Sequence, residues 1–307
     1  MSEAFYRLAQ GMRLSSLGIG TYLGAADDAT DANYEAALTA AIAGGINVID
    51  TSRNYRAERS EKAIGRAIAG FNRDELVLCT KAGYHIGSRG HSLHPDFLAA
   101  NLHASLANLN VPQVDIFYLH NPETQLAETG PEAFYSQIHA AFERCETMAA
   151  QGLLRFYGAA TWDGFRVEAN FIDIHRLAAI ANDIAGPRHR FRFVQLPFNL
   201  AMLEAFNRRQ HAGGTSLLQS AAQLGLTVIG SATVYQGRLT KGLPDKLAAH
   251  FHGLHTDAQR AIQFSRSTPG IAVSLVGMST PAHVAENLAV KNVAPLSERD
   301  YYAIYAR

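Results

Sequence analysis

Eight short apolar runs alternate with longer amphipathic segments along the chain, and this alternation limits the possible folds more than any other feature. Continuous apolar strands separated by helices are typical of parallel sheets that are covered on both faces. The expected strands are Leu17–Thr21, Ile46–Asp50, Leu76–Lys81, Val114–His120, Leu154–Thr161, Phe193–Leu196, Thr227–Ser231 and Ala272–Met278. The expected helices are Asp31–Ala43, Ser60–Ala69, Pro95–Leu109, Glu132–Ala150, Phe165–Ile180, Ser216–Leu224, His255–Arg266 and Pro281–Ala289.

Eight strand–helix units in 307 residues take about 38 residues each, which fits a (β/α)8 TIM barrel. A doubly wound open sheet is the alternative, but it usually has fewer strands at this length. No linker or low-complexity stretch divides the chain. We therefore expect an α/β fold with a single domain over residues 1–307, closed by a short helix after Leu296.

A glycine pattern near the N-terminus is similar to the dinucleotide fingerprint of a Rossmann domain. Gly18, Gly20 and Gly24 follow an apolar run, but the next helix is expected only near Asp31. The next acidic strand end, Asp50, comes too late for the fingerprint. We interpret the glycines as a turn at the mouth of the barrel and expect no Rossmann domain.

Composition excludes several kinds of partner. The chain has 27 Lys and Arg against 27 Asp and Glu, whereas proteins that bind nucleic acids or anionic membranes carry a basic excess. Two cysteines, Cys79 and Cys145, are too few for a disulfide framework. Residues 1–10 lack an apolar signal core, and no run reaches transmembrane length. We expect a cytoplasmic protein, monomeric or homo-oligomeric, whose partner is a small molecule rather than a nucleic acid or a membrane.

Polar side chains end three consecutive expected strands. The chemistry of a parallel barrel lies at the C-terminal ends of its strands, where side chains from different strands converge. Asp50, Lys81 and His120 occupy such ends, and Tyr55 follows Asp50 by five residues. Each has an ordinary alternative as a rim side chain that is bonded to the loops or to solvent. Their convergence at one rim nevertheless predicts a shared site.

These four side chains together suit proton donation to a carbonyl oxygen. A phenol has an ordinary pKa of about 10, and an adjacent ammonium such as Lys81 lowers it. Asp50 would keep Lys81 charged and oriented, and His120 would donate a hydrogen bond to the carbonyl oxygen. We expect Tyr55 to be the acid in a site where the carbonyl carbon accepts hydride from another molecule.

At these residues the sequence resembles the aldo-keto reductase family. The resemblance follows family order through nearly the whole chain, in LGIGTY (17–22), GGINVIDTSRNY (44–55), RSEKAIGRAI (59–68), LCTKAGY (78–84), VDIFYLHNP (114–122), GLLRFYGAAT (152–161), FVQLPFN (193–199), VIGSATVYQGRLT (228–240) and GMSTPAHVAENL (277–288). It implies a (β/α)8 oxidoreductase in which Asp50, Tyr55, Lys81 and His120 form a catalytic tetrad.

The resemblance also implies a nicotinamide cofactor, NADP(H) or alternatively NAD(H). It assigns cofactor contacts to Gly20, Thr21, Thr161, Gln195, Ser231, Gly237, Arg238, Lys241, Gly277, Met278, Ser279, His283, Glu286 and Asn287. It assigns the substrate pocket to Tyr22, Tyr84 and Asn121. Loop lengths indicate that Gly83–His94, Glu123–Gly130 and Thr233–Gly253 form the walls of that pocket.

Several positions depart from the family pattern. The Ser-Asn pair that usually holds the carboxamide after the fifth strand is Ala160-Thr161 here, so only Thr161 can bind it. Ser231 stands in place of the aromatic that commonly stacks on the nicotinamide, and Tyr235 is the nearby aromatic that could compensate. Glu58 replaces a common glycine, and His283 stands where basic residues usually meet a 2′-phosphate. Guanidinium is always charged but histidine is mostly neutral at pH 7, so the preference for NADP is implied less firmly than cofactor binding.

Two further groups of residues invite a functional interpretation. Arg53, Arg56 and Arg59 surround Tyr55 and suit an anionic substrate, or they balance nearby acidic side chains in solvent. Histidines cluster within residues 85–94 and 250–255, but no Cys or carboxylate stands at zinc-ligand spacing. We expect no metal site.

Two other functions stay open beside the main one. One is a regulatory barrel, similar to the channel-associated β subunits of the same family, in which a bound nucleotide reports to a partner. The other is a Schiff-base lyase that uses Lys81. The complete tetrad favours an oxidoreductase that interconverts an aldehyde or ketone and its alcohol, with hydride from nicotinamide C4 and a proton from Tyr55.

Overall fold

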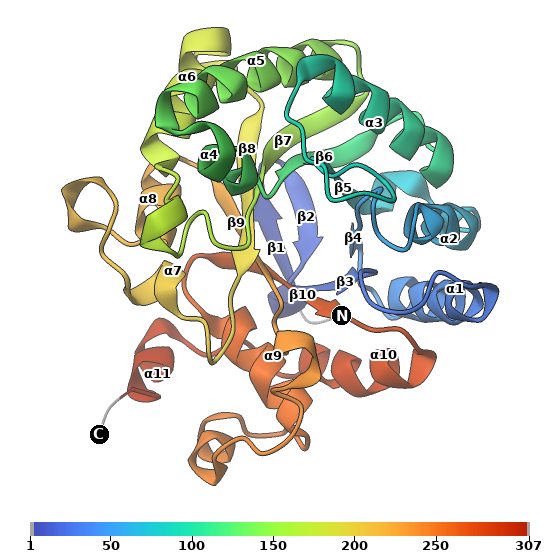
Figure 1. The fold of residues 1–307 in the computed structure, drawn as a ribbon. Coiled ribbons are helices and arrows are strands. Elements are labelled where there is room, and N and C mark those ends of the chain that lie inside the picture. The colour runs from blue at the N-terminus through green and yellow to red at the C-terminus, as the bar shows by residue number, and fades with distance from the viewer. Residues whose placement is uncertain (1–2, 306–307) are drawn as a thin grey trace.

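Eight parallel strands form a closed barrel in the computed structural model of the chain, which describes residues 3–305 (Figure 1). The barrel strands are β3 (Leu17–Gly20), β4 (Val48–Asp50), β5 (Val77–Ala82), β6 (Val114–His120), β7 (Leu154–Ala160), β8 (Phe191–Pro197), β9 (Thr227–Ser231) and β10 (Ile271–Gly277). They neighbour one another in chain order, and β10 closes the ring against β3. The expected (β/α)8 barrel is therefore confirmed, although the first two and last two residues of the expected domain lie outside the described residues.

Helices surround the strands, and local signals set their ends. They are α1 (Asp28–Ala43), α2 (Arg59–Ile68), α3 (Pro95–Leu109), α5 (Pro131–Ala150), α6 (Ile174–Ala185), α8 (Leu217–Gln223), α9 (Asp257–Ser267) and α10 (Pro281–Asn287). Helix α3 begins on Pro95 and ends at Asn110 in the left-handed conformation. Capping boxes begin α8 at Ser216 and α9 at Thr256.

One expected helix begins much later than its apolar spacing predicted. The sequence predicted a helix from Phe165, but α6 begins at Ile174, where the Asp173 side chain accepts a hydrogen bond from the His175 backbone amide. Phe165 and Ile172 are both buried. Their spacing therefore reflects the packing of a loop onto the barrel rather than one face of a helix.

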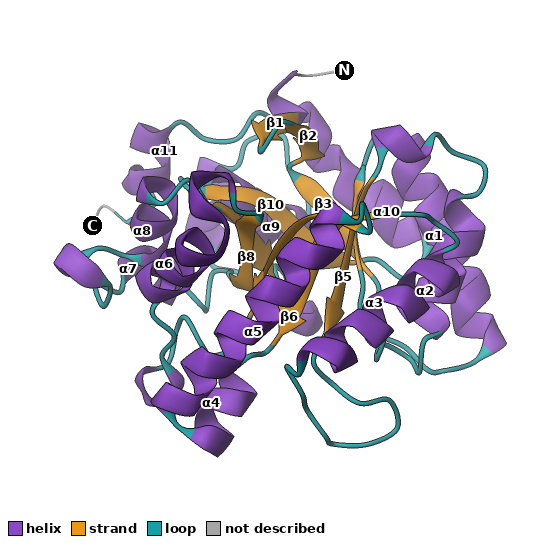
Figure 2. Cartoon of the chain, turned by 90° about the horizontal axis from the view of Figure 1, so that it is seen from above, coloured by secondary structure: helices purple, strands orange, loops and turns teal. Residues whose placement is uncertain are grey.

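The structure contains four strands and helices that the sequence did not predict. These are the hairpin strands β1 (Tyr6–Ala9) and β2 (Met12–Ser15), and the short helices α4 (Glu123–Thr129) and α7 (Glu204–Asn207). The expected closing helix is present as α11 (Glu298–Ala303). Figure 2 shows the hairpin at one end of the barrel and α4 at the opposite end.

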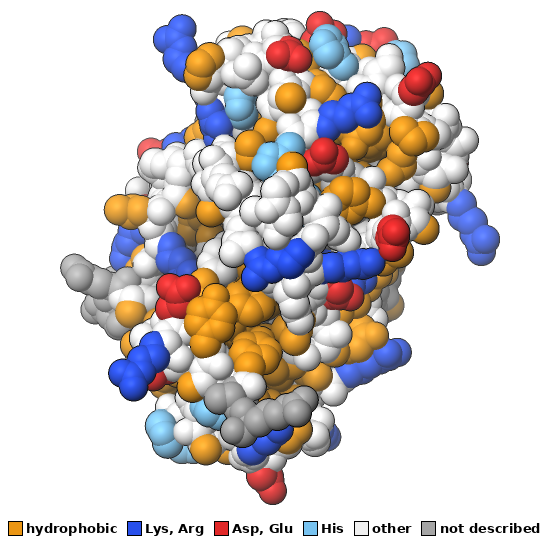
Figure 3. All heavy atoms as spheres, turned by 90° about the vertical axis from the view of Figure 1, so that its left-hand side faces the viewer, with side chains coloured by type: hydrophobic (Ala, Val, Ile, Leu, Met, Phe, Trp, Pro, Cys, Tyr) orange, Lys and Arg blue, Asp and Glu red, His pale blue; other side chains and the backbone are white. Residues whose placement is uncertain are grey.

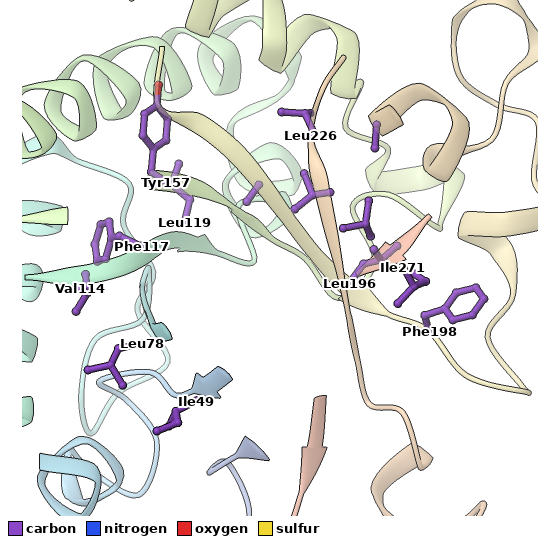
Figure 4. Close-up of a cluster of buried hydrophobic side chains, with 14 of the residues drawn as sticks. Ile49, Leu78, Val114, Phe117, Leu119, Tyr157, Leu196, Phe198, Leu226 and Ile271 are labelled. Atoms are coloured by element: carbon purple, nitrogen blue, oxygen red, sulfur yellow. The ribbon is translucent and has the colours of Figure 1, made fainter. Parts of the chain in front are cut away.

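Two apolar layers hold the barrel together. Successive residues of a barrel strand face opposite sides of the sheet. Ile116 belongs to an inner cluster that the hairpin closes with Met12 and Leu14. Phe117 and Leu119 belong to the outer cluster between the strands and the helices, part of which Figure 4 shows.

The strand register brings the polar strand ends to one rim. Gly20 pairs with Asp50 across β3 and β4, and Ala160 pairs with both His120 and Gln195 across β6, β7 and β8. Because all eight strands are parallel, these residues lie at the same end of the barrel, on the side away from the hairpin.

The surface carries both charges. On the face drawn in Figure 3, basic side chains lie interspersed with acidic ones. Among residues 3–305, no helix combines the length and the apolar character that a membrane span requires.

Candidate active site

A cavity of about 790 Å³ lies at the C-terminal ends of the barrel strands. Asp50, Tyr55 and His120 of the expected tetrad line it. So do the three expected substrate residues, Tyr22, Tyr84 and Asn121. The expected cofactor residues in its walls are Gly20, Thr21, Thr161, Gln195, Ser231, Gly237, Lys241, Gly277, Ser279, His283, Glu286 and Asn287.

Three of the residues expected at the site do not reach the cavity wall. Lys81 is 1% exposed and lies behind Asp50. Met278 is fully buried in the outer apolar cluster, because β10 ends at Gly277 and the next side chain turns into the core. The Arg238 guanidinium lies 5.0 Å from the centre of the Tyr235 ring, and neither of these two residues lines the described cavity.

Lys81 and Asp50 form a buried ion pair. Lys81 Nζ donates to Asp50 Oδ2 at 2.5 Å and to the Thr51 carbonyl oxygen at 2.8 Å. Gln195 Nε2 donates to the other Asp50 oxygen at 2.8 Å. Burial by itself would lower the pKa of Lys81, but the Asp50 carboxylate and the Tyr55 phenol outweigh it, so this pKa is raised. Lys81 is therefore an ammonium at neutral pH.

Tyr55 lies between this ammonium and the aromatic wall of the cavity. Its ring centre is 5.1 Å from Lys81 Nζ, 5.0 Å from the Tyr22 ring and 5.8 Å from the His120 ring. Burial raises the pKa of Tyr55, the Lys81 charge lowers it and Asp50 raises it again, and the net shift is upward. The Lys81 charge does lower the pKa of Tyr55, as expected. The net shift is nevertheless upward, because burial removes the water that would stabilise the phenolate.

His120 is a neutral imidazole in this position. Burial lowers its pKa well below the ordinary value, and the nearby Lys81 charge lowers it further. His120 Nδ1 lies 3.2 Å from Ser52 Oγ, and the Tyr84 ring packs against the imidazole with its centre 5.1 Å away. A neutral imidazole held in this way can donate one hydrogen bond to a ligand in the cavity.

Three buried polar atoms in the cavity wall lack a partner within residues 3–305. They are Thr161 Oγ1, Thr233 Oγ1 and Asn287 Oδ1. Buried polar atoms are normally hydrogen-bonded, so these three are available to a polar ligand in the cavity. A Cβ at Gly20 would meet only the Val276 carbonyl oxygen, at 3.9 Å, and this glycine therefore leaves room in the cavity.

Sequence reasoning missed part of the cavity wall. Thr233, Gln236 and Thr240 lie in the long loop that was expected to line the pocket. The residues predicted individually in this loop were Tyr235, Gly237, Arg238 and Lys241. Trp162 directly follows Thr161, so extending each strand end by one residue would have found it. The missed lining residues are Leu23, Asn54, Ala160, Trp162, Ala232, Thr233, Val234, Gln236, Thr240, Ala258, Leu275 and Val276.

The loop from Glu123 to Gly130 does not line the described cavity, contrary to expectation. Its residues 123–129 form α4 instead. Glu123 Oε1 accepts hydrogen bonds from the backbone amides of Trp162 at 2.7 Å and Asp163 at 2.9 Å. This segment therefore supports the wall that carries Trp162 from behind.

The three arginines around Tyr55 are paired with acidic side chains. Arg56 lies 2.7 Å and Arg59 2.8 Å from the Asp31 carboxylate, and Arg53 lies 2.8 Å from Glu58. These arginines are not among the residues that line the described cavity. Their pairing favours a structural role over recognition of an anionic substrate.

The histidine clusters form no metal site in the part of the chain that the structure describes. Within it, no group of three or more His, Cys, Asp or Glu side chains is placed to hold an ion.

The fold and the rim site define the class of (β/α)8 barrel proteins with an acid–lysine–tyrosine–histidine constellation. The family model for the Aldo/keto reductase family matches residues 16–306, and the chain belongs to this family. The resemblance read from the motifs is thus confirmed.

Curated relatives cover most of the chain at low identity. A putative voltage-gated potassium channel subunit beta of Schizosaccharomyces pombe is 22% identical over 91% of this chain and 85% of its own length. A probable subunit of the same kind from Oryza sativa subsp. japonica is 23% identical over 93% and 90%.

Solved structures share the fold. The glycerol dehydrogenase of Gluconobacter oxydans matches with a TM-score of 0.75 at 19% identity, covering 99% of this chain and 94% of its own. An aldo/keto reductase from Klebsiella pneumoniae in complex with NADP and acetate matches with a TM-score of 0.70 at 21% identity, covering 98% and 94%.

Proposed function

We propose that the protein is an NADP(H)-dependent oxidoreductase that interconverts an aldehyde or ketone and its alcohol, with Tyr55 as the proton donor. The observation that carries this proposal is the placement of Tyr55 beside the buried Lys81–Asp50 pair at the wall of the large cavity. Family membership and the NADP complex of a structural neighbour support the choice of cofactor. A cytoplasmic location and a small-molecule carbonyl or alcohol substrate go with this proposal.

The cavity residues fit a nicotinamide dinucleotide. Thr161, Thr233 and Asn287 offer unpaired polar atoms, and Lys241 offers a positive charge. When bound, the reduced cofactor supplies a hydride equivalent from nicotinamide C4 to the carbonyl carbon. The ionisable side chains of α10 that line the cavity are His283 and Glu286. No arginine is among the described lining residues, so a phosphate at α10 would lack a guanidinium partner there. NAD(H) therefore stays the alternative cofactor.

Tyr55 would protonate the carbonyl oxygen as negative charge develops on it. Its raised pKa keeps the phenol protonated at neutral pH, and the Lys81 ammonium stabilises the phenolate that remains. Neutral His120 would donate a hydrogen bond to the same oxygen and fix its position.

A regulatory barrel is the second candidate function. Two curated relatives are described as potassium channel β subunits, and the chain matches more than nine-tenths of its own length to each. A Schiff-base lyase is supported less, because Lys81 is 1% exposed, paired with Asp50 and protonated at neutral pH.

Cofactor titration followed by a carbonyl and alcohol panel tests the proposal. We expect NADPH to bind and to be consumed with several carbonyl compounds, and Tyr55→Phe to abolish turnover while leaving NADPH affinity close to wild type. Tight, slowly exchanging NADPH with negligible turnover across the panel would favour the regulatory barrel. Borohydride trapping of a substrate on Lys81 without any dinucleotide would favour the lyase. Retention of most of kcat by Tyr55→Phe would remove Tyr55 from the mechanism.

A further inference from the structure

The backbone directly after Tyr55 is strained. Arg56, Ala57 and Glu58 have φ angles of +49°, +51° and +71°, so three consecutive residues with side chains occupy the left-handed region. Only glycine adopts this conformation without a steric cost, and other residues keep it only where surrounding contacts hold them. The position of Tyr55 therefore depends on what holds this left-handed run, residues 56–58.

The Arg56 side chain binds α1 directly and contacts the segment after β3 through Ser60. Its side chain is 1% exposed, and Nη1 lies 2.7 Å from Asp31 Oδ1 on α1. Arg56 Nε donates to Ser60 Oγ at 3.1 Å, and Ser60 Oγ donates to the Thr21 carbonyl oxygen at 2.8 Å. Thr21 follows β3 and lines the cavity. One side chain thus connects the left-handed run to α1 and to the cavity wall.

Asp31 binds the run on both sides. Its Oδ1 accepts from Arg56, which begins the run, and its Oδ2 lies 2.8 Å from Nη2 of Arg59, which follows the run. Asp31 is 6% exposed. Replacing Asp31 would leave the buried Arg56 guanidinium without its carboxylate partner. Replacing Arg56 would leave Asp31 paired with Arg59 and with Arg66, which lies 3.4 Å from Oδ2, but would release the run itself.

We propose that Asp31 and Arg56 are positioning residues for Tyr55. Their ion pair holds residues 56–58 in the left-handed conformation and so keeps the Tyr55 ring 5.1 Å from Lys81 Nζ. Neither residue is among those lining the described cavity, so both act through the backbone of the run. The kinetic part of this inference rests on the proposed function, whereas its structural part does not.

Asp31→Asn and Arg56→Gln test the proposal against Glu35→Gln as the matched control. Glu35 lies on the same helix and pairs with Arg66 at 2.7 Å, at a more exposed position. Arg66 also lies 3.4 Å from Asp31 Oδ2, so this control changes the exposed edge of the same network without touching Arg56. We expect kcat to fall about 10- to 100-fold in the first two variants, because small displacements of a reacting group have effects of that size. The KM for the carbonyl and the Kd for NADPH should change less than about threefold, and Glu35→Gln should match wild type.

Hydrogen exchange of the cofactor-free protein supplies a readout independent of activity. Peptides covering residues 51–59 should exchange about tenfold faster in Asp31→Asn and Arg56→Gln, with the barrel strands unchanged. Adding Ala57→Gly to Asp31→Asn should restore part of both kcat and protection, because glycine adopts a left-handed φ without steric cost. Ala57→Gly alone should have little effect.

Several outcomes would overturn the proposal. These are wild-type kcat in both Asp31→Asn and Arg56→Gln, an equal loss in Glu35→Gln, no recovery with Ala57→Gly, or a loss of NADPH affinity as large as the loss of kcat. If Asp31→Asn does not fold, Arg56→Lys carries the same test, with a smaller expected loss of kcat because lysine keeps the charge but not the fork of donors. A wild-type protein without turnover would contradict the proposed function alone, and the exchange rates would still decide whether the pair orders the run.

Discussion

Lys81 Nζ lies 2.5 Å from Asp50 Oδ2, and the lysine side chain is 1% exposed. The pair is held on its other side by Gln195, which donates to Asp50 Oδ1 at 2.8 Å. The cavity therefore has a fixed positive charge behind its wall rather than a free amine in it. This arrangement suits stabilisation of a phenolate better than attack on a carbonyl carbon.

Replacing Lys81 by methionine should separate catalysis from stability. Lys81→Met removes the charge that, in the proposed mechanism, stabilises the Tyr55 phenolate, so we expect kcat to fall about 10²- to 10⁴-fold with little change in the Kd for NADPH. It also leaves Asp50 buried and unpaired, which should lower the free energy of unfolding by roughly 3–5 kcal/mol. Kinetics and urea unfolding measure the two effects.

The double variant Asp50→Asn/Lys81→Met is the control for that experiment. It removes both charges, so most of the lost stability should return while kcat stays low. Recovery of kcat in the double variant would mean that Lys81 acts on folding rather than on Tyr55.

The pH dependence of turnover follows from the shifts at Tyr55 and His120. In the proposed mechanism, reduction needs the protonated Tyr55 phenol, whose pKa is raised above the ordinary value of 10.0. Reductive kcat should therefore stay level from about pH 7 to 9 and fall only above about pH 10. Alcohol oxidation would need the phenolate, so the kcat for oxidation should rise as the pH increases from about 7 to 10. The pKa of His120 lies well below 6.5, so no limb should appear near that pH. A fall in reductive kcat between pH 7 and 8 would contradict the assignment of Tyr55.

Thr233→Val removes a hydroxyl that has no partner in the described structure. Thr233 is fully buried and lines the cavity, and its Oγ1 is unpaired. If this hydroxyl binds the dinucleotide, the Kd for NADPH should rise about 5- to 30-fold in the valine variant. The cofactor-free protein should keep or gain thermal stability, because an unsatisfied buried group is removed. A lower melting temperature with unchanged NADPH affinity would contradict a ligand contact.

His211 predicts a loss of stability on acidification. Both of its ring nitrogens are buried without a partner in residues 3–305, and burial lowers its pKa to about 4. A folded-state pKa below the unfolded value contributes stability that is present above about pH 6.5 and is lost as the pH falls toward 4. We expect this residue to account for about 1–3 kcal/mol of that loss, reduced by residual screening from water. We expect the free energy of unfolding, measured with urea between pH 7.5 and 4.5, to fall less steeply with decreasing pH in His211→Phe than in wild type.

Much of the barrel was predictable because its signals are local. The apolar runs end within two residues of the observed strands, and the polar residues at Asp50 and His120 coincide with strand ends. The expected helix Pro95–Leu109 matches α3 at both ends. Apolar spacing misled at Phe165, where a buried loop has the same pattern as a helix face.

Most of the residues that the sequence assigned to the site line the cavity, but the contacts between them could not be predicted. The strand-end rule and the family resemblance found Tyr55 and Gln195, yet the contact between Gln195 and Asp50 joins residues 145 positions apart. The family resemblance placed Met278 at the cofactor, but its side chain lies in the core directly after β10 ends at Gly277.

The sequence by itself determined the parallel barrel and the rim where its polar strand ends meet, because both follow from periodicity and from the chain direction of parallel strands. Only the tertiary structure decided how the arginines after Tyr55 pair, since Arg56 and Asp31 belong to different helical units and meet only in the folded barrel. It also decided the sign of the pKa shift at Tyr55. That sign is a balance between burial and two nearby charges, and burial is a property of the whole packed molecule.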